Sequence, residues 1–354
     1  MFKSENYEHQ NCGYAMNAMM DENAVRLYEE SIVIDGLNVS NWDRDAVYRS
    51  LVHGGVTASN ATIAVWEGFR ATVDHIVGWQ SRYQRLHDLL VPVHTVDDIF
   101  QAKKQKKAGI ILGFQNASPI ENDLGRLSLF HQLGVRIIQL TYNERNLLGN
   151  GCYERYDEGL SHFGLDAVRE MNRLGILIDL SHCGERTTLE AIEKSSVPVA
   201  ITHANARAFV DFVRNKTDDA LKLLVERGGV IGAVSFPLFL RNGYDSSLSD
   251  FGDAIDDLVE RVGIDHVGIG NDFCQDQPHR FFEWLFAQQG TKFRPLPVGI
   301  PDPHHHPRDL ELPDHMPHLA GELLRRGYGS EDVAKILGEN FLHLFEKVWS
   351  GEGR

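Results

Sequence analysis

Two histidines at the ends of consecutive apolar runs are the residues most able to do chemistry in this sequence. His182 ends the run GILIDLSH (175–182), and His203 lies near the end of the next run, VPVAITHA (197–204). A lone histidine after a strand is usually a structural or surface residue, but two at matching positions on neighbouring strands can share a metal ion. Imidazole suits zinc or a related divalent ion. The pair therefore predicts a metal site.

A carboxylate, an arginine and a tyrosine accompany this pair. Asp272 lies in HVGIGNDF (266–273), where it can ligate a metal, accept a proton from water, cap a helix or form an ion pair. Arg214 follows His203 at a spacing of 214 − 203 = 11 residues. A guanidinium there can bind a carboxylate through two parallel hydrogen bonds, although an arginine is more commonly a surface residue. Tyr142, in VRIIQLTYN (135–143), can donate to an oxyanion or pack in the core.

Other polar residues occupy the same kind of position. Asp35 and Asn38 lie at the end of one apolar run, and Gln115 and Asn116 end the run GIILGFQN (109–116). Polar residues stand at the ends of the apolar runs more often than composition alone would give. If these runs are strands of a barrel, such residues lie at its active end.

The apolar runs themselves predict the fold. Continuous Val, Ile and Leu runs indicate strands buried on both faces, as in parallel sheets, and amphipathic segments such as FGLDAVREMNRLG and TDDALKLLVERGG separate them. Eight such alternations favour an α/β fold, a (β/α)8 TIM barrel with C-terminal helices, over an open sheet, since no GxGxxG follows the first run. The predicted strands lie within 31–37, 55–65, 109–116, 135–143, 175–182, 197–204, 229–236 and 266–273.

We expect one domain over residues 21–354, preceded by a loose extension at 1–20. Within the domain we expect a long loop at 274–312 and closing helices at 313–349. The loop contains three consecutive histidines, His304, His305 and His306, which can bind metal but are more typical of a solvated loop.

Composition limits the classes of partner. There are 35 Lys and Arg residues against 50 Asp and Glu residues, a net charge of −15 that disfavours binding to nucleic acid. No apolar stretch approaches the roughly 20 residues of a membrane span, so we expect no membrane partner. The four cysteines form no CxxC pair, which is typical of reduced thiols in the cytoplasm.

The strand ends resemble those of the membrane dipeptidase, or renal dipeptidase, family of amidohydrolase-like barrels. The best match is GLSHFGLDAVREMNRLGILIDLSH (159–182), followed by ITHANARAF…RN at 201–215 and HVGIGNDF at 266–273. The resemblance implies a metal-dependent hydrolase of a dipeptide or related small amide, and a homodimer. It also implies that His182 and His203 bind one zinc ion, that Asp272 serves the other metal and the water, and that Arg214 holds the substrate carboxylate.

The sequence departs from this family at the site of the other metal. Where the family has His-x-Asp after its first strand, this chain has Leu37 and Val39, and Gln115 replaces the bridging glutamate. Tyr142 replaces a histidine. Aliphatic side chains cannot bind a hard cation, and a neutral amide bridges two cations poorly. We therefore predict one metal per chain, with Gln115 as a remaining candidate ligand.

The first interpretation is a one-metal amide hydrolase acting on a small carboxylate-bearing substrate. In it Tyr142 and Asn116 orient a substrate carbonyl, and Asn38 is a further candidate for substrate binding. The alternative is a lyase, isomerase or other hydrolase that reuses the barrel with altered or absent metal. A binder of small molecules without catalysis is disfavoured, because His182, His203 and Asp272 occur together.

Overall fold

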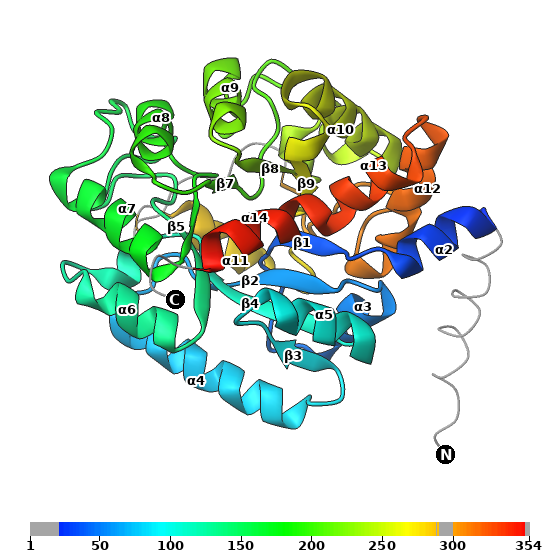
Figure 1. The fold of residues 1–354 in the computed structure, drawn as a ribbon, viewed down its shortest axis with the longest axis horizontal. Coiled ribbons are helices and arrows are strands. Elements are labelled where there is room, and N and C mark those ends of the chain that lie inside the picture. Colours follow the sequence, from blue (N-terminus) through cyan, green and yellow to red (C-terminus); the bar gives the residue numbers. More distant parts are fainter. Residues whose placement is uncertain (1–20, 288, 290–299, 351–354) are drawn as a thin grey trace.

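The computed structural model describes residues 21–287, 289 and 300–350. Its strands are all parallel, and eight of them close into a barrel in the order β1, β2, β4, β5, β6, β7, β8 and β9, with β9 pairing back onto β1 (Figure 1). The predicted (β/α)8 barrel with C-terminal helices is confirmed. The extension expected at 1–20 lies outside the described residues.

The elements have the following bounds. The strands are β1 (Ile34–Asn38), β2 (Ala58–Ala64), β3 (Leu90–Pro92), β4 (Ala108–Phe114), β5 (Val135–Gln139), β6 (Leu177–Asp179), β7 (Ala200–Ile201), β8 (Val230–Ala233) and β9 (Val267–Ile269). The α-helices are α2 (Glu22–Glu30), α3 (Asp45–His53), α4 (Phe69–Arg85), α5 (Val96–Gln105), α6 (Gly125–Gln132), α7 (His162–Leu174), α8 (Glu185–Lys194), α9 (Asp218–Glu226), α10 (Leu248–Val262), α11 (His279–Phe286), α12 (Pro317–Arg325), α13 (Ser330–Ala334) and α14 (Asn340–Trp349). A π-helical turn, Lys335–Glu339, joins α13 to α14.

Each of the eight predicted apolar runs overlaps a barrel strand, but β3 was not predicted. It is three residues long and pairs only with the start of β4. Three residues are too few to give a periodic pattern, and Pro92 cannot donate to a ladder. Because β2 pairs directly with β4, this extra strand leaves the barrel closed.

Local signals explain where the helices begin and end. The hydroxyl of Thr217 accepts a hydrogen bond from the backbone N–H of Ala220, which caps the start of α9. Helix α7 ends at Gly175, whose φ of 72° lies in the left-handed region that favours glycine. These caps fix the chain's path into β6 and β8, the strands that follow the two helices.

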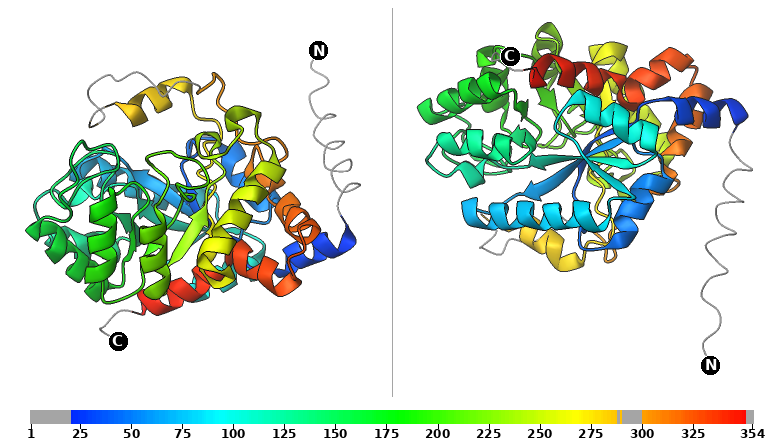
Figure 2. Two further views of the ribbon diagram at one scale, coloured as in Figure 1. Left: turned by 90° about the horizontal axis from the view of Figure 1, so that it is seen from above. Right: turned by 60° about the horizontal axis from the view of Figure 1, so that its bottom comes forward.

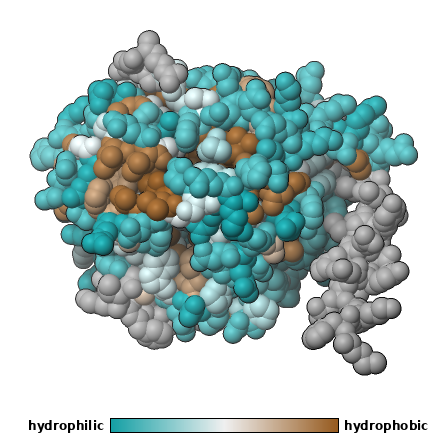
Figure 3. Space-filling view, turned by 90° about the horizontal axis from the view of Figure 1, so that it is seen from below, coloured by the Kyte–Doolittle hydropathy of each residue, from teal (hydrophilic) through white to brown (hydrophobic). Residues whose placement is uncertain are grey.

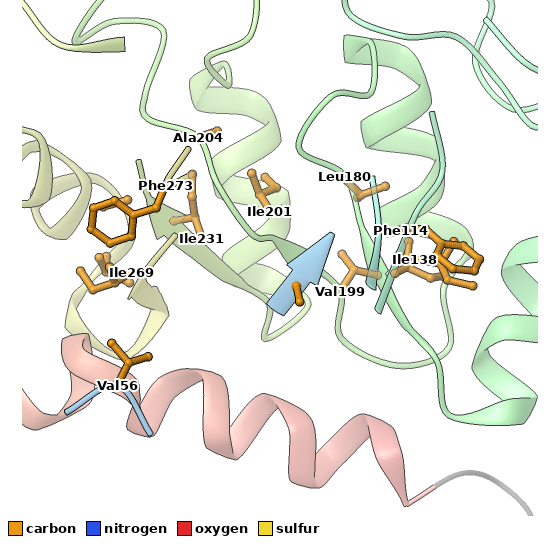
Figure 4. Close-up of a cluster of buried hydrophobic side chains, with 14 of the residues drawn as sticks. Val56, Phe114, Ile138, Leu180, Val199, Ile201, Ala204, Ile231, Ile269 and Phe273 are labelled. Carbon is orange, nitrogen blue, oxygen red and sulfur yellow. The ribbon is translucent and has the colours of Figure 1, made fainter. Parts of the chain in front are cut away.

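The core has two main layers. The first lies between the barrel and its helices, and Figure 4 shows part of it, with Ile138, Ile201, Ile231 and Ile269 contributed by four strands. The second fills the barrel at the amino ends of its strands, where Phe341 and Phe345 of α14 pack among strand residues such as Ile111. Helix α14 therefore closes the amino end and leaves the carboxyl ends of the strands for a site.

The segment 274–312, expected to be a loop, contains helix α11. Its Phe282 and Leu285 are buried in a third cluster with Val39, Tyr142 and residues that follow β8 and β9. Figure 2 shows α11 on the side of the molecule opposite α14. The helix forms because its apolar residues recur at helical spacing, which gives it one buried aromatic face and one polar face.

The face of the molecule drawn in Figure 3 is mainly hydrophilic. Figure 3 shows apolar side chains gathered in patches on one face. Among the described residues, no helix is both long and apolar enough to cross a membrane.

Candidate functional site

A pocket lies at the carboxyl ends of the strands, where the fold predicts chemistry. Aromatic and aliphatic side chains form most of its wall, and most of the sequence-predicted site residues line it. The lining residues are Val39, Gln115, Tyr142, Asn143, Tyr153, His182, Phe212, Arg214, Phe236, Leu238, Phe239, Asp272, Cys274, Phe282, Leu285 and Phe286. They lie in the segments that follow β1, β4, β5, β6, β7, β8 and β9.

The two histidines meet at one point. The Nε2 atoms of His182 and His203 are 3.0 Å apart, and both residues are buried. Burial, together with the nearby Arg214, holds the pKa of each imidazole well below its usual range, so both rings are neutral near pH 7. The structure thus brings together the two residues that the sequence predicted as metal ligands.

Hydrogen bonds on the far side of each ring fix which nitrogen carries the lone pair. His182 Nδ1 lies 2.7 Å from Asn143 Oδ1, which can only accept. His203 Nδ1 lies 2.8 Å from Thr202 Oγ1, whose proton is directed to Asp179 Oδ2 at 2.7 Å. Both Nδ1 atoms therefore donate, and two Nε2 lone pairs face each other. These two lone pairs repel each other unless both bind the same cation. With a third ligand added, the two Nε2 donors therefore fit a zinc ion.

Gln115, which lines the same pocket as His182, is the predicted candidate for that third ligand. Its side-chain nitrogen donates to Thr62 Oγ1 at 3.0 Å, which leaves the amide oxygen to ligate. Among the residues that the structure describes, no His, Cys, Asp or Glu forms a compact group of three ligands with the histidine pair. A metal at the pair therefore depends on Gln115 or on water for its remaining ligands.

Asp272 lines the same pocket directly after β9. Its backbone N–H donates to the carbonyl of Leu37 at 3.1 Å, and its φ of 60° is one that few residues other than Gly, Asn and Asp adopt. Burial raises the pKa of its carboxyl to about 6, while Arg214 acts in the opposite direction. A carboxyl with such a pKa can exchange a proton near neutral pH.

Arg214 is buried and joins the histidine pair to the pocket. One terminal nitrogen donates to the carbonyl of Ser181, and the other donates to the carbonyl of His203 at 2.8 Å. Its guanidinium lies over the ring of Phe239 at 5.2 Å. The Nε atom is buried with no hydrogen-bond partner among the described residues. That N–H and the remaining terminal protons are available to a carboxylate.

Tyr142 stacks on His182 with ring centroids 4.1 Å apart, and its ring centroid also lies 5.1 Å from that of Trp66. Burial raises the pKa of its hydroxyl well above the ordinary value, with a smaller contribution from Asp272. The hydroxyl is therefore a neutral donor at physiological pH.

The structure does not bring Asn38 and Asn116 into this pocket. The Asn38 side chain accepts from the backbone N–H of Ser40 at 3.0 Å, and Asn116 Oδ1 accepts from Asn146 at 2.9 Å. The Asn38 bond is local, whereas the Asn116 bond links side chains 30 residues apart along the chain. The role of these two residues in substrate binding stays a prediction. Leu37 is buried, and Val39 contributes an apolar part of the pocket wall.

Sequence reasoning missed Lys216. This lysine is 3% exposed, and its ammonium donates to the carbonyls of Leu180 and Cys183 at 2.6 and 3.1 Å. It thus fixes the turn that presents His182. The stretch RNKTDD is typical of an exposed loop, so nothing in the sequence distinguishes this lysine.

Asp35 of β1 gives a prediction on stability. Its carboxyl is 1% exposed, and one oxygen has no hydrogen-bond partner among the described residues. Burial raises its pKa to about 7, against the lowering effect of hydrogen bonds from Asn271. The folded state thus favours the protonated form, while the unfolded chain ionises near pH 4. The resulting penalty grows between about pH 4 and pH 7 and is constant above that.

Asp35→Asn resembles the protonated form and removes this penalty. We expect the variant to have a higher free energy of unfolding than the wild type at pH 8, by up to about 4 kcal/mol. The gain should be roughly 2–3 kcal/mol smaller at pH 5. Urea denaturation at the two pH values measures it, with exposed Asp88→Asn as the control. A difference that does not change with pH, or a less stable variant at pH 8, would contradict this prediction.

The sequence profile of the membrane dipeptidase family (peptidase family M19) matches residues 21–283. Dipeptidase tcpJ of Claviceps purpurea (strain 20.1) is 30% identical over 266 residues, which are 74% of this chain and 56% of that protein. Dipeptidase verJ of Clonostachys rogersoniana is 27% identical over 290 residues, 80% of this chain and 67% of that protein. The chain thus spans little more than half the length of the Claviceps relative.

Among solved structures, an amidohydrolase from Pseudomonas aeruginosa superposes with a TM-score of 0.89 at 41% identity, covering 92% of this chain and 99% of that one. The match covers most of the chain, and it includes the strands that end at His182, His203 and Asp272. The chain belongs to the membrane dipeptidase family, peptidase family M19.

Proposed function

We propose that this protein is a metal-dependent hydrolase of a small amide that bears a carboxylate. One zinc ion is held by His182 and His203, with the amide oxygen of Gln115 as the further protein ligand. The observation that carries the proposal is a pair of Nε2 atoms 3.0 Å apart whose lone pairs face each other. Beside them lies the buried Arg214, whose Nε–H has no hydrogen-bond partner among the described residues. A divalent cation held there supplies Lewis acidity, which activates water and polarises an amide carbonyl.

The protein's own groups supply the remaining steps. Arg214 binds the substrate carboxylate through Nε–H and a terminal N–H, which orients the amide against the histidine pair. Asp272 accepts a proton from the attacking water and returns it to the leaving amine nitrogen. Tyr142 donates its hydroxyl proton in a hydrogen bond to the carbonyl oxygen as negative charge develops there.

The residues at the end of β1 limit the range of substrates that the site can accept. Leu37 and Val39 carry no donor atoms, so a second cation has no ligands on this side. One cation cannot both activate water and bind a substrate amine as a two-metal site does. We therefore propose a narrow specificity, for a substrate with an apolar group against Val39 and the aromatic wall, and poor activity as a general dipeptidase.

The function is tested by comparing metal content and hydrolysis in the same preparations. We expect the wild type to bind one equivalent of zinc more than the variant His182→Asn/His203→Asn, by elemental analysis. It should hydrolyse N-acyl amino acids or a few dipeptides from a panel that includes D-configured C-terminal residues. Ring orientation depends on Asn143, so Asn143→Ala should weaken this zinc by about 10–100-fold.

Two results would contradict the proposal. One is equal zinc content in the wild type and the double variant. The other is turnover of many unrelated dipeptides at the roughly 1–10³ s⁻¹ of ordinary enzymes, which would mean that the β1 substitutions do not restrict activity.

A further inference from the structure

A second group of potential metal ligands lies next to the pocket, outside the histidine pair. Cys274 follows β9, and His304 and His306 lie in the segment that follows α11. The ligand atoms of these three residues all lie within 4.8 Å of one another. Cys274 and His306 are 6% and 2% exposed, so the histidine trio is not the solvated loop that its sequence favoured. Only the middle histidine, His305, is exposed.

Both histidines of this group have a hydrogen-bond partner on Nδ1. Tyr244 Oη lies 2.9 Å from His304 Nδ1, and Ser235 Oγ lies 3.4 Å from His306 Nδ1. Either hydroxyl can accept the Nδ1 proton, which leaves the lone pair on Nε2. Metal-binding histidines are commonly oriented by such a bond on the other ring nitrogen.

The two Nε2 atoms differ in their partners. His306 Nε2 accepts a hydrogen bond from the backbone N–H of Cys274 at 3.3 Å, and this bond has to open before the lone pair can bind a metal. His304 Nε2 is buried with no hydrogen-bond partner in the described part of the chain. Leaving a buried polar atom unpaired costs about 1–3 kcal/mol, and a bound ligand removes that cost.

Aromatic rings shield the group from water. Phe236 stacks on His304 with centroids 4.9 Å apart, Phe282 lies 4.8 Å from the same ring, and Phe273 lies 5.0 Å from His306. A dry surround strengthens the bond between a cation and a thiolate because little solvent competes for either.

We propose that Cys274, His304 and His306 bind a zinc ion, at a site separate from the pair His182–His203. Thiolate and imidazole are both ligands that zinc binds, and three such ligands leave a fourth position for water. Donors around zinc lie roughly 3.3–3.8 Å apart, so the side chains need to close by about 1 Å. Binding breaks the S–H bond, and the thiol proton, now directed to the carbonyl of Asp272 at 3.2 Å, leaves to solvent.

This ion has a structural consequence for the pocket. Cys274 precedes α11 and His304 follows it, so the ion ties together the two ends of the segment that carries this helix. Phe282 and Leu285 of α11 line the pocket, as does Cys274 itself. Zinc there fixes one wall of the substrate pocket, and it adds a second metal that the sequence did not predict.

Cobalt substitution of the full chain tests the site. Thiolate bound to Co²⁺ gives a charge-transfer band in the near ultraviolet, and a site made of imidazoles does not. We expect the wild type to show this band at one equivalent per chain and to lose it when zinc is added. Cys274→Ser should abolish the band, and His304→Gln should weaken Co²⁺ binding at least tenfold.

Matched controls separate this site from the first. His305→Gln changes the exposed neighbour, and Cys152→Ser removes another thiol of the pocket region; both should keep the band. The variant His182→Asn/His203→Asn should also keep it, although it loses the zinc of the proposed catalytic site. If Cys274→Ser does not fold, as judged by circular dichroism, His304→Gln decides alone.

The proposal is overturned if the wild type shows no thiolate band. It is also overturned if the band is unchanged in the variant Cys274→Ser, or in the variant His304→Gln on its own. It is overturned as well if the band disappears in the His182→Asn/His203→Asn variant, since the thiolate would then share one metal with that pair and the two sites would not be separate. None of these results depends on hydrolysis, so the site can fail while the proposed function stands, and the reverse.

Discussion

Replacing Asp272 with asparagine should lower kcat on any hydrolysed amide by about 10²–10⁴, the usual contribution of a general base. The change keeps the shape of the side chain but removes the group that accepts and returns the proton. Asparagine tolerates the left-handed backbone at this position, where φ is 60°, so the fold should not change. Steady-state kinetics on the best substrate of the panel measures the effect.

A nearby residue provides the control. Asp276 has a φ of 59° and is exposed, and it lies only four residues further along the chain (276 − 272 = 4). Asp276→Asn should leave kcat within about twofold, since substitutions far from a reaction centre usually have small effects. Zinc content should be the same in both variants and the wild type. A fall of less than tenfold for Asp272→Asn would assign the proton transfer to another group.

The sequence predicted the barrel and its active end because buried parallel strands leave a strong apolar signal. His182, His203 and Asp272 each stand near the end of such a run, and the closed sheet brings these ends to one pocket. The position of a residue along a strand is enough to predict which end of the barrel it occupies. It does not predict which direction the side chain faces, and Asn116 is bonded to Asn146 away from the pocket.

What the sequence missed depends on contacts between distant segments. His306 is buried because Phe273 and Ser235, which follow β9 and β8, pack against it. Lys216 is buried because carbonyl groups near the end of β6 accept its protons. Both residues lie in polar stretches that are typical of solvated loops, and no local pattern distinguishes a buried loop residue from an exposed one.

The apolar residues at the end of β1 and the buried Arg214 together limit the substrates that the proposed function allows. The family resemblance alone would imply two metals, but Leu37 and Val39 provide no ligand for one of them. Arg214 keeps its place beside His203, with a free Nε–H. In the proposed function a single cation serves this pocket, so recognition of the substrate carboxylate depends more heavily on Arg214.

Arg214→Ala should lower kcat/KM on a carboxylate substrate by about 10²–10⁴, because two charge-assisted hydrogen bonds of roughly 1.5–3 kcal/mol each are lost. Arg214→Lys keeps the charge but cannot form the two parallel bonds, so it should still lose at least about tenfold. Arg207→Lys is a matched control, since Arg207 donates to the carbonyl of Val213 at 3.1 Å and does not line the pocket.

A structural role for Arg214 has to be separated from binding, because its guanidinium also donates to the carbonyls of Ser181 and His203. The separation comes from a second substrate in which a carboxamide replaces the carboxylate. If Arg214 binds the carboxylate, the wild type should prefer the charged substrate strongly, and Arg214→Lys and Arg214→Ala should lose most of that preference. If the arginine only supports the strand ends, both substrates should suffer equally and zinc content should fall with them. Equal losses on the two substrates would therefore remove Arg214 from the binding site while leaving the histidine pair in place.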